Sequence, residues 1–518
     1  MATTGTSWPA SRVTAPEVRA GERQWRSAHL VGVCGSGMKA LAELLTGLGW
    51  TVSGSDNNAS EAVVAALSRR GLRIHPGHHG RFLADKTDVL VYSPAIGPEN
   101  AERQRALAVG IPQLSYSQML GALMRIRKGV CIAGTHGKST TTAMTGCILT
   151  AAGLAAAVVV GAEVREIGVS GWSGSGECFV VESCEFQKSF LDLSPRHAAI
   201  LGIEPDHFDC YPHFDETIAA FSEFAQRVPG DGRLLIHAGC EASKAACVAA
   251  GASVETFSVE NAGIESSADW HAADLVPTAA GTRFRVFHQG DFLAEISLRI
   301  PGLHNVANAL AAAALAHAAG AAPAAIREAL GDFPGIRRRF EPVGSWRGVT
   351  LIDDYAHHPT AVAGTLATAR ARYPRRRLWC VFQPHQVSRT EALFSEFTAS
   401  LAGADRVLLV PVFAAREQVR DEPALVSRRL AGQIVASGGA ARFVDTLDQA
   451  LATLEDELRP GDVLITMGAG DIGKVHHALT RAVPGHHAPR RTPGSLHLAE
   501  DRGSGAISDH PADSPRTR

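Results

Sequence analysis

Gly134-Thr135-His136-Gly137-Lys138-Ser139-Thr140-Thr141-Thr142 decides the fold of this chain, and it directly follows the apolar run Val130-Cys131-Ile132-Ala133. An apolar run followed at once by glycines, a lysine and hydroxyl residues predicts a strand, a loop and a helix. Glycines let backbone N–H groups approach phosphate oxygens, and the helix N-terminus favours negative charge. The stretch therefore predicts an α/β unit that binds ATP.

Two kinds of side chain in this loop suit a triphosphate. Lys138 can reach the β- and γ-phosphates, and the hydroxyl of Ser139 or Thr140 can ligate Mg²⁺. The loop is shorter than the standard GxxxxGK[ST] pattern, because isoleucine stands at position 132. The alternative is a glycine-rich turn with a solvated lysine. Four consecutive hydroxyl residues after Lys138 favour nucleotide binding instead.

The pattern divides the chain into three α/β units between two polar tails. At 518 residues the chain is too long for one core, and short apolar runs alternate with amphipathic helical stretches, as in parallel sheets. The tails lack apolar periodicity, so we expect them to be disordered. The expected segments are a tail at 1–27, units at 28–128, 129–335 and 336–482, and a tail at 483–518. Polar loops at strand ends in each unit predict substrates gathered at one interdomain cleft.

The first unit carries a weak dinucleotide-type signature. An expected strand over 29–33 leads into Gly35-Ser36-Gly37 and a helix, and a second strand over 51–54 ends at Asp56. This spacing places a diphosphate at the helix N-terminus and lets Asp56 hold a ribose. The pattern predicts a ligand that carries a nucleotide, without deciding which one.

In the central unit, two polar residues stand at or just past the ends of expected strands. Glu182 ends the run over 178–181, and His207 follows the run over 198–201. The carboxyl ends of parallel strands lie side by side, so both residues are expected to face the triphosphate. Glu182 can ligate Mg²⁺, and His207 can ligate a second ion. The alternatives are a surface ion pair for Glu182 and a capping role for His207. Glu185, one helical turn past Glu182, fits a solvated face equally well.

The third unit has two polar clusters that follow strands. Asp353-Asp354-Tyr355-Ala356-His357-His358-Pro359 follows an expected strand over 350–352, and no core would favour so many acids and histidines. His385-Gln386-Val387-Ser388-Arg389 comes shortly after an expected strand over 378–382. Arg389 is a candidate to bind a substrate carboxylate. The alternatives are a structural turn for the first cluster and a surface arginine for the second.

Composition narrows the classes of function. Charge is nearly balanced, with 50 Lys and Arg against 52 Asp and Glu, which argues against nucleic acid or an anionic membrane as a partner. The nine cysteines form no CxxC pair, which favours free thiols in a reducing compartment. Residues 1–28 lack the apolar core of a signal peptide, and no apolar run approaches a membrane span. We therefore expect a soluble cytoplasmic protein.

Taken together, these motifs resemble those of the Mur ligase family, over about residues 28–480. The double histidine before Pro359 is typical of the branch that acts before the ligases adding later stem-peptide residues. The most specific parts are Gly134-Thr135-His136-Gly137-Lys138, Ile203-Glu204-Pro205-Asp206-His207, His304-Asn305 with Asn308, Asp353 to Pro359, and Gly468-Ala469-Gly470-Asp471-Ile472-Gly473.

The resemblance implies a fold and a reaction. The fold would be α/β in three domains: a Rossmann-like N-terminal domain for a UDP-sugar, a central P-loop ATPase-type domain with a parallel or mixed sheet, and a C-terminal Rossmann-like domain that closes over the site. The lactyl carboxylate of UDP-N-acetylmuramate would take the γ-phosphoryl group of ATP, and the amine of L-alanine would then displace phosphate from the acyl phosphate. Mg²⁺ would assist. The enzyme would be a monomer or homodimer that makes peptidoglycan precursors.

The resemblance also implies roles for single residues. Lys138 would stabilise the transferred phosphoryl group, Ser139 and Glu182 would hold one Mg²⁺, and His207 would help to hold a second. Asn305 would contact the adenine. The other implied positions are Gly134, Thr135, His136, Gly137, Thr140 and Asp353 for the nucleotide, Gly35, Ser36, Gly37 and Asp56 for the UDP-sugar, and Tyr355, His357, His385 and Arg389 around the acceptor.

Several positions depart from the family pattern. Gln386 stands where we expect arginine, so Arg389 would be left alone to contact the amino acid; this change concerns the acceptor and not the ATP chemistry. The other departures are Cys34 for glycine, Ser139 for threonine, Cys184 for an acidic residue and Gly202 for asparagine.

Three other functions stay open at this point. A murein-recycling ligase would attach a tripeptide to the same UDP-sugar and would share the phosphate loop and the double histidine. A nicotinamide-dependent dehydrogenase would use the first-unit signature but would leave Lys138, Glu182 and His207 idle. A catalytically inactive nucleotide sensor would tolerate the departures at Gly202 and Gln386. We interpret the sequence as a ligase that uses L-alanine.

Overall fold

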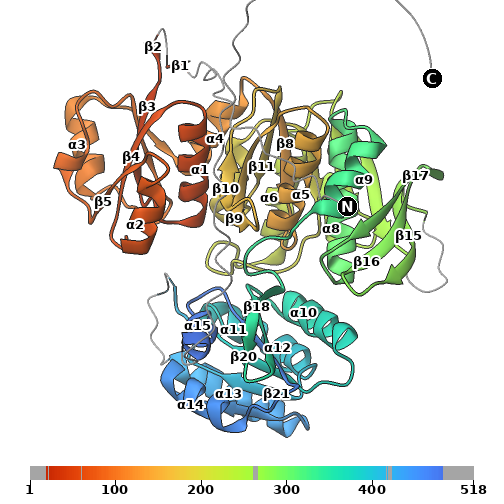
Figure 1. Cartoon of the computed structure of the whole chain (residues 1–518). Helices are drawn as coiled ribbons and strands as arrows, with labels where there is room; N and C mark the ends of the chain where they lie inside the picture. The colour runs from red at the N-terminus through yellow and green to blue at the C-terminus, as the bar shows by residue number, and fades with distance from the viewer. Residues whose placement is uncertain are drawn as a thin grey trace, which may run out of the picture.

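The computed structural model describes residues 19–20, 23–59, 61–260, 267–415, 417 and 423–481. These residues form three large sheets with helices packed against them, and Figure 1 shows them as three bodies coloured from red through green to blue. The predicted α/β class with three sheets is confirmed. No helix of the described residues has the length and apolarity needed to span a bilayer.

The N-terminal sheet is parallel, with the strand order β5-β4-β3-β6-β7. This is the order of a doubly wound fold, and its switch point lies where β3 meets β6. The strands are β3 (Ser27–Val31), β4 (Thr51–Asp56), β5 (Arg73–Pro76), β6 (Val89–Tyr92) and β7 (Gln113–Ser115). The helices are α1 (Ser36–Gly47), α2 (Glu61–Ser68), α3 (Ala101–Val109) and α4 (Tyr116–Met124), with the short η1 (Gly80–Phe82).

The tail expected over residues 1–27 is shorter than the sequence suggested. The strands β1 (Arg19–Ala20) and β2 (Arg23–Gln24) pair with each other, and Trp25 is buried in the core of the N-terminal domain. A single tryptophan offers enough apolar area to anchor a segment whose other residues are polar. The expectation of disorder is therefore wrong for the described part of this segment. Residues 1–18, and the tail expected over 483–518, lie outside the described residues.

The central sheet is mixed and has the strand order β10-β9-β11-β8-β12-β13-β14-β15-β16-β17. The strands from β9 to β15 in this order run parallel, and β10, β16 and β17 are antiparallel additions at the edges. The strands are β8 (Lys128–Ala133), β9 (Ala157–Val164), β10 (Val169–Trp172), β11 (Cys178–Glu182), β12 (Pro195–Ile200), β13 (Arg233–His237), β14 (Ser253–Val259), β15 (Trp270–Pro277), β16 (Thr282–His288) and β17 (Asp291–Leu298).

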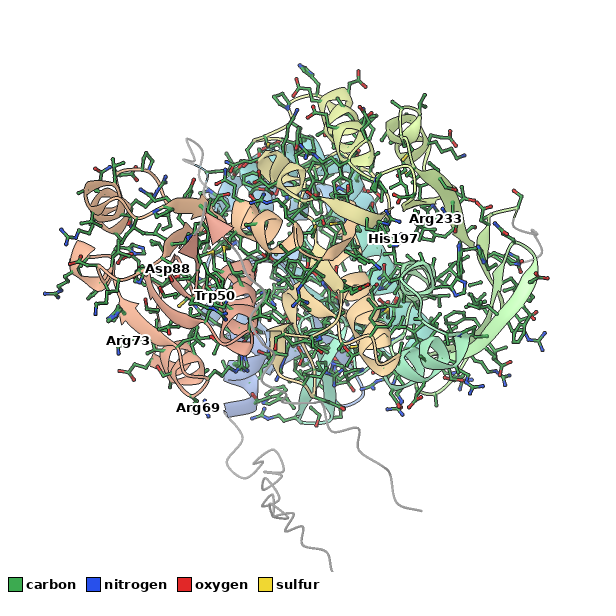
Figure 2. The ribbon with its side chains drawn as sticks, turned by 90° about the horizontal axis from the view of Figure 1, so that it is seen from above. Trp50, Arg69, Arg73, Asp88, His197 and Arg233 are labelled. Atoms are coloured by element: carbon green, nitrogen blue, oxygen red, sulfur yellow. The ribbon has the colours of Figure 1, made fainter. Side chains whose placement is uncertain are left out.

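The direction of the parallel strands decides where the site lies. Figure 2 shows His197 and Arg233 close together, and these residues are paired at the amino ends of β12 and β13. The phosphate loop follows β8 at the opposite, carboxyl edge of the same sheet. The helices are α5 (Lys138–Ala151), η2 (Phe186–Asp192), α6 (Phe214–Ala225), α7 (Glu241–Cys247), α8 (Leu303–Ala318) and α9 (Pro323–Asp332).

The C-terminal sheet has the strand order β18-β19-β23-β20-β21-β22, in which only β18 is antiparallel. The strands are β18 (Glu341–Trp346), β19 (Val349–Asp354), β20 (Leu378–Phe382), β21 (Arg406–Leu409), β22 (Ala441–Phe443) and β23 (Val463–Met467). The helices are α10 (Pro359–Arg372), α11 (Val387–Ala392), α12 (Phe394–Leu401), α13 (Pro423–Ala436), α14 (Leu447–Glu457) and α15 (Lys474–Arg481).

Close contacts hold the N-terminal domain against the central one. Lys39 in α1 forms an ion pair with Glu163 at 3.0 Å. Glu43, one turn further along α1, accepts hydrogen bonds from the backbone N–H groups of Ser170 and Gly171 in β10 at 2.7 and 3.1 Å. These bonds pair the buried Glu43 carboxylate with an edge strand of the central sheet, so the first two domains share polar as well as apolar contacts.

Glu102 is a buried polar centre of the N-terminal domain. Its carboxylate accepts a hydrogen bond from the Ser55 hydroxyl at 2.5 Å and one from the backbone N–H of His79 at 3.1 Å, with His29 Nε2 at 3.5 Å. Burial raises the pKa of Glu102, but hydrogen bonds from His29 and Ser55 outweigh burial and leave the pKa below its ordinary value. The ionised form is therefore the one that the fold favours.

We expect Glu102→Gln to lower the free energy of unfolding by about 1–3 kcal/mol at neutral pH, because it removes a charged acceptor from buried donors. The lowered pKa means that this stabilisation is present above the ordinary pKa of glutamate and disappears as the pH falls through the folded-state value. Urea unfolding at several pH values measures the difference, with the exposed Glu99→Gln as the control. Equal stability of both variants at neutral pH would contradict this role for Glu102.

Candidate active site

The loop between β8 and α5 has the shape of a phosphate cradle. Gly134 and Gly137 adopt φ of +128° and +81°, in the region that only glycine enters without strain, and α5 begins at Lys138. A Cβ atom on Gly137 would also collide with the side-chain oxygen of Asn308 in α8. The free N–H groups of the first turn of α5 point out of the helix, so the loop can bind an anion.

Lys138 is held above this loop by a buried carboxylate. Its ammonium lies 3.1 and 2.9 Å from the two carboxylate oxygens of Glu185, which is only 2% exposed. Burial by itself lowers the pKa of Lys138, but the charge of Glu185 outweighs burial and leaves the pKa above its ordinary value. The lysine is therefore charged and is placed where it can meet a phosphate.

The alternative of a solvated Glu185 is wrong. Glu185 precedes η2, and its backbone carbonyl accepts a hydrogen bond from the buried Tyr211 hydroxyl at 2.5 Å. This turn carries the side chain back from the end of β11 toward the phosphate loop. Its spacing from Glu182 was visible in the sequence, but the residues that enclose it come from a distant loop.

Ser139 and Glu182 lie together, as their places at the ends of β8 and β11 predict. The Ser139 hydroxyl donates a hydrogen bond to one carboxylate oxygen of Glu182 at 3.0 Å, and the backbone N–H of Gly161 donates to the other at 2.5 Å. The next hydroxyl, on Thr140, is buried in α5. Two hard oxygen donors thus stand beside the helix N-terminus.

His207 reaches the same edge of the sheet from the loop after β12. Its backbone has φ of +53°, and its buried Nδ1 atom has no hydrogen-bond partner among the described residues. Nε2 lies 3.7 Å from a carboxylate oxygen of Glu185. Burial lowers the pKa of His207 despite the charges of Asp206 and Glu185, so the ring is neutral and has a free lone pair for a ligand.

The C-terminal domain meets this edge through a buried ion pair. Arg389 in α11 is 2% exposed and donates from Nε to Asp206, next to His207, at 2.7 Å. Burial raises the pKa of Asp206, but the charge of Arg389 outweighs burial and holds the pKa well below its usual range. The expectation of an Arg389 open to a substrate carboxylate is not met in this conformation, because a buried carboxylate of the central domain already occupies it.

Three more predicted residues of the C-terminal domain lie around this pair. The rings of His357 and His385 are 5.7 Å apart, and His385 contacts Arg389 through its carbonyl oxygen at 3.1 Å. His357 Nδ1 lies 2.8 Å from the backbone oxygen of Tyr355, so it carries the hydrogen. Burial lowers the pKa of His357 well below its ordinary value. The neutral imidazole of His357 thus lies on this side of the interface.

Gln386, which stands where we expected arginine, lies in the same place. It is 1% exposed, has φ of +68°, and its side-chain nitrogen has no hydrogen-bond partner within the described residues. A buried amide donor left without an acceptor costs free energy unless something binds to it.

Asn305 lies in a helix that is hydrogen-bonded to α5, whereas Asp353 lies inside a strand of the C-terminal sheet. Asn305 is buried in the first turn of α8, where Asn308 donates to it at 3.3 Å, and Asn308 in turn accepts from Thr141 of α5 at 3.3 Å. Asn305 is thus linked to the phosphate loop. Asp353 is not in a loop but belongs to β19, where it accepts a hydrogen bond from Thr466 at 2.8 Å, because the ladder with β23 continues through Asp354.

The predicted first-unit residues gather at the switch point of the N-terminal sheet. Gly35 caps α1, Ser36 and Gly37 begin it, and a Cβ atom on Gly37 would lie 2.9 Å from the ring of Tyr116. Asp56 accepts backbone hydrogen bonds from Cys34 and Asn58, both at 2.8 Å. In this conformation Asp56 shapes the glycine loop and is only 8% exposed.

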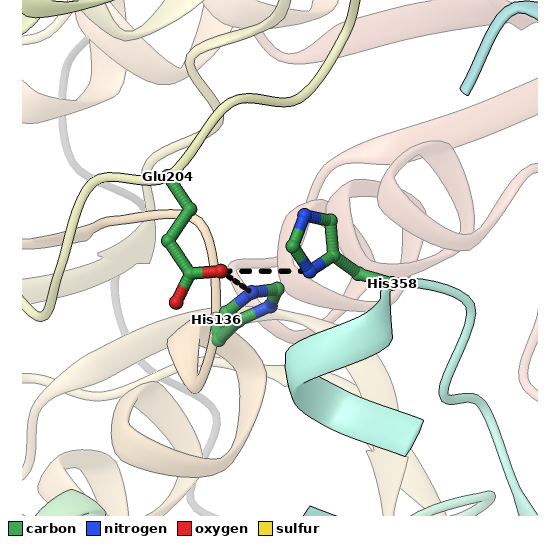
Figure 3. Close-up of side chains that lie close together, drawn as sticks. All are labelled: His136, Glu204 and His358. Atoms are coloured by element: carbon green, nitrogen blue, oxygen red, sulfur yellow. Dashed lines mark hydrogen bonds and ion pairs between the residues drawn. The ribbon is translucent and has the colours of Figure 1, made fainter. Parts of the chain in front are cut away.

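A further cluster joins the phosphate loop to the C-terminal domain, and sequence reasoning missed two of its members. Figure 3 shows His136 of the loop, Glu204 after β12 and His358 at the start of α10 facing one another. Glu204 also accepts a hydrogen bond from Thr360 at 2.6 Å. The double histidine and the run around Glu204 were conspicuous as motifs, but the sequence did not predict that these two segments would contact each other. Together with Thr135, which donates to the Glu204 carbonyl at 3.3 Å, they connect the two domains beside the nucleotide loop.

This arrangement has a definite chemical capacity. One cationic lysine, two hard oxygen ligands and a neutral imidazole converge on a helix N-terminus, while a second domain covers them from the other side. Such a site can bind a phosphorylated nucleotide, neutralise charge on a phosphoryl group and exclude water during its transfer.

Comparisons with known proteins agree with this geometry. Three family descriptions match successive parts of the chain: "Mur ligase family, catalytic domain" over residues 27–128, "Mur ligase middle domain" over 132–316, and "Mur ligase, glutamate ligase domain" over 338–470. Two similar relatives are UDP-N-acetylmuramate–L-alanine ligases. The one from Acidithiobacillus ferrooxidans is 41% identical over 88% of this chain and 97% of its own, and the one from Desulfitobacterium hafniense is 38% identical over 87% and 98%.

Solved structures are similar over most of the chain. The UDP-N-acetylmuramate–alanine ligase of Thermotoga maritima matches with a TM-score of 0.73 and 25% identity, over 88% of this chain and 98% of its own. A murein peptide ligase of Psychrobacter arcticus matches with a TM-score of 0.66 and 26% identity, over 89% and 100%.

Proposed function

Because the chain belongs to the Mur ligase family, we propose that it joins L-alanine to the lactyl carboxylate of UDP-N-acetylmuramate at the expense of ATP, a step in peptidoglycan precursor synthesis. The observation that carries this proposal is the Lys138–Glu185 pair above a glycine-rich loop, in a chain 41% identical to a ligase of that name. A dehydrogenase has no use for this pair, since hydride transfer involves no phosphoryl group.

In the first step the carboxylate oxygen of the sugar attacks the γ-phosphorus of ATP, and ADP leaves. Negative charge spreads over the oxygens of the transferred group. The Lys138 ammonium would leave the Glu185 carboxylate and bind these oxygens. The N–H groups of the loop over 134–137 would bind the neighbouring phosphates. Asn305, connected to the loop through Asn308, would contact the adenine from α8.

The residues beside the loop fit a magnesium ion. The Ser139 hydroxyl and the Glu182 carboxylate are hard oxygen ligands, the kind that Mg²⁺ prefers. They already lie within 3.0 Å of each other. The buried Nδ1 of His207, which has no hydrogen-bond partner among the residues that the structure describes, is suited to hold a second ion nearby. When bound, the ions would neutralise charge on the phosphates.

In the second step the amine of L-alanine attacks the acyl carbon, an amide bond forms, and phosphate leaves. His357, His385 and Tyr355 of the C-terminal domain would orient the amino acid, and the contacts of the His357 ring with the rings of Tyr355 and His385 support a shared role. Arg389 would act by holding this face against Asp206. The UDP part would occupy the glycine loop over 35–37 of the N-terminal domain.

The rival function is attachment of a whole tripeptide. Among the solved structures the alanine ligase and the murein peptide ligase are about equally identical to this chain, at 25% and 26%, but the alanine ligase has the higher TM-score, 0.73 against 0.66. Relatives named as alanine ligases reach 41% identity over most of the chain, which supports L-alanine as the acceptor.

Phosphate release from ATP, with UDP-N-acetylmuramate present, tests the function. We expect release with L-alanine to exceed release with glycine, L-serine or the tripeptide by at least about tenfold in kcat/KM, since a lost or added side-chain contact of one or two methylenes is worth roughly 1–3 kcal/mol. Omission of the UDP-sugar is the control. Release that depends on the tripeptide alone would overturn the proposal in favour of recycling, and no release with any acceptor would favour a sensor.

A further inference from the structure

The cluster of His136, Glu204 and His358 has spacings that match those around a metal ion. Glu204 Oε2 lies 3.4 Å from His136 Nε2 and 3.5 Å from His358 Nδ1, and the three candidate ligand atoms all lie within 4.8 Å of one another. Two ligands on a tetrahedral ion with bonds of about 2.1 Å are about 3.4 Å apart. Two of the three spacings thus match those of ligands around one ion, and the third is at most 4.8 Å.

Hydrogen bonds around His358 decide which of its nitrogens could bind an ion. His358 Nε2 lies 3.2 Å from the backbone oxygen of Pro205, which can only accept, so Nε2 carries the hydrogen. Nδ1 therefore carries the lone pair; it lies 3.5 Å from Glu204 Oε2 and accepts a long hydrogen bond, at 3.4 Å, from the backbone N–H of Thr360. Glu204 Oε2 accepts a hydrogen bond from the Thr360 hydroxyl at 2.6 Å, so both atoms are acceptors and both would be attracted to a cation bound between them. A backbone carbonyl on the far nitrogen is also the usual partner of a metal-bound histidine.

We propose that His136, Glu204 and His358 bind one first-row transition ion of the Zn²⁺ type, separate from the magnesium ligands Ser139 and Glu182. Two imidazoles and one carboxylate suit Zn²⁺, Co²⁺ or Ni²⁺, whereas Mg²⁺ binds oxygen ligands in preference to imidazoles. Three protein ligands leave at least one coordination position open.

The position of the site means that a bound ion would connect two domains. His136 belongs to the phosphate loop, Glu204 follows β12 of the same domain, and His358 begins α10 of the C-terminal domain. An ion bound here connects the two domains directly beside the nucleotide. It fixes His136 and holds the C-terminal domain in place, in addition to the Arg389–Asp206 pair.

Titration of the full-length protein with Co²⁺ tests the site, because Co²⁺ bound by imidazole and carboxylate absorbs visible light. Excess Mg²⁺ is present and nucleotide is absent, so that the oxygen ligands are occupied. We expect one Co²⁺ per chain with visible absorption, displaced by Zn²⁺. His358→Gln and His136→Gln should each weaken this binding by at least about tenfold, which is the effect of losing one of three ligands.

The exposed His213→Gln, on the central domain, is the matched control and should bind Co²⁺ as the unaltered protein does. Circular dichroism checks that each variant is folded, and the two test variants lie on different domains, so that one local defect cannot explain both losses. Unchanged Co²⁺ binding in His358→Gln and His136→Gln would overturn the proposal, as would the absence of visible absorption in the unaltered protein. Neither result depends on turnover, so the ligase function is judged separately.

Discussion

Lys138→Met is expected to lower kcat for L-alanine-dependent phosphate release by about 10²–10³-fold, because it removes a preorganised positive charge from a site where charge develops. Lys138 is the one cation that the described residues place on the phosphate loop itself, with its ammonium held by Glu185 at 2.9 Å. The effect should appear in kcat as well as in the KM for ATP, since the charge is needed most by the phosphoryl group in transit.

The same change also affects stability, and a second variant separates the two effects. Lys138→Met leaves the Glu185 carboxylate buried without its partner, which costs about 3–5 kcal/mol in typical cases. The double variant Lys138→Met/Glu185→Gln replaces the ion pair with neutral groups. We expect it to recover most of the unfolding free energy, measured by chemical denaturation, while activity stays low. Recovery of activity in the double variant would contradict a direct role of Lys138 in catalysis.

Arg389→Ala is expected to release the C-terminal domain from the central one. It leaves Asp206 buried and unpaired, and the lost docking free energy should be about 3–5 kcal/mol. Small-angle scattering should then show a larger radius of gyration than for the unaltered protein, and kcat/KM for L-alanine should fall. The exposed Arg429→Ala, which removes a surface pair with Glu391 and a cation–π contact with Phe394 within the C-terminal domain, is the matched control and should change neither quantity.

A double-mutant cycle makes this prediction more specific. If Arg389 acts through Asp206, the effects of Arg389→Ala and Asp206→Asn should not be additive. The coupling between the two substitutions should then account for most of the change in scattering and stability. If Arg389 instead binds the carboxylate of the amino acid, its removal should raise the KM for L-alanine and leave the radius of gyration unchanged. The second result would restore the role that the sequence suggested.

The fold was largely predictable because its signals are local. The apolar run over 130–133, the glycines and the hydroxyl residues predict a strand, a loop and a helix, and the structure has β8 and α5 there. The family resemblance and the α/β class are likewise confirmed. The incorrect predictions concern residues whose burial depends on distant segments and so cannot be predicted from a local pattern. Trp25 anchors a segment expected to be disordered, and Asp353 and Asp354 extend β19 because β23 lies beside them.

The candidate site was predictable only in part, for the same physical reason. Glu182 ends β11, and Ser139 lies in the first turn of the helix after the neighbouring parallel strand β8, so the topology brings the two residues together. Glu185 and Arg389 depend on contacts between distant segments. Glu185 is enclosed by a turn and by Tyr211, and Arg389 pairs with Asp206 across a domain interface. A sequence shows which residues are unusual, but the partner that a buried charge requires has to be found in three dimensions.

Phosphoryl transfer at the loop that carries Lys138 is expected to activate the lactyl carboxylate. Heavy-oxygen label placed in that carboxylate of UDP-N-acetylmuramate tests this step, with mass spectrometry of the phosphate released in the presence of ATP and L-alanine. We expect one labelled oxygen in every phosphate, because the carboxylate oxygen that attacks the γ-phosphorus stays on phosphorus when the amine displaces phosphate from the acyl phosphate. Phosphate that contains no label would show that water attacks ATP instead and would rule out activation of the carboxylate.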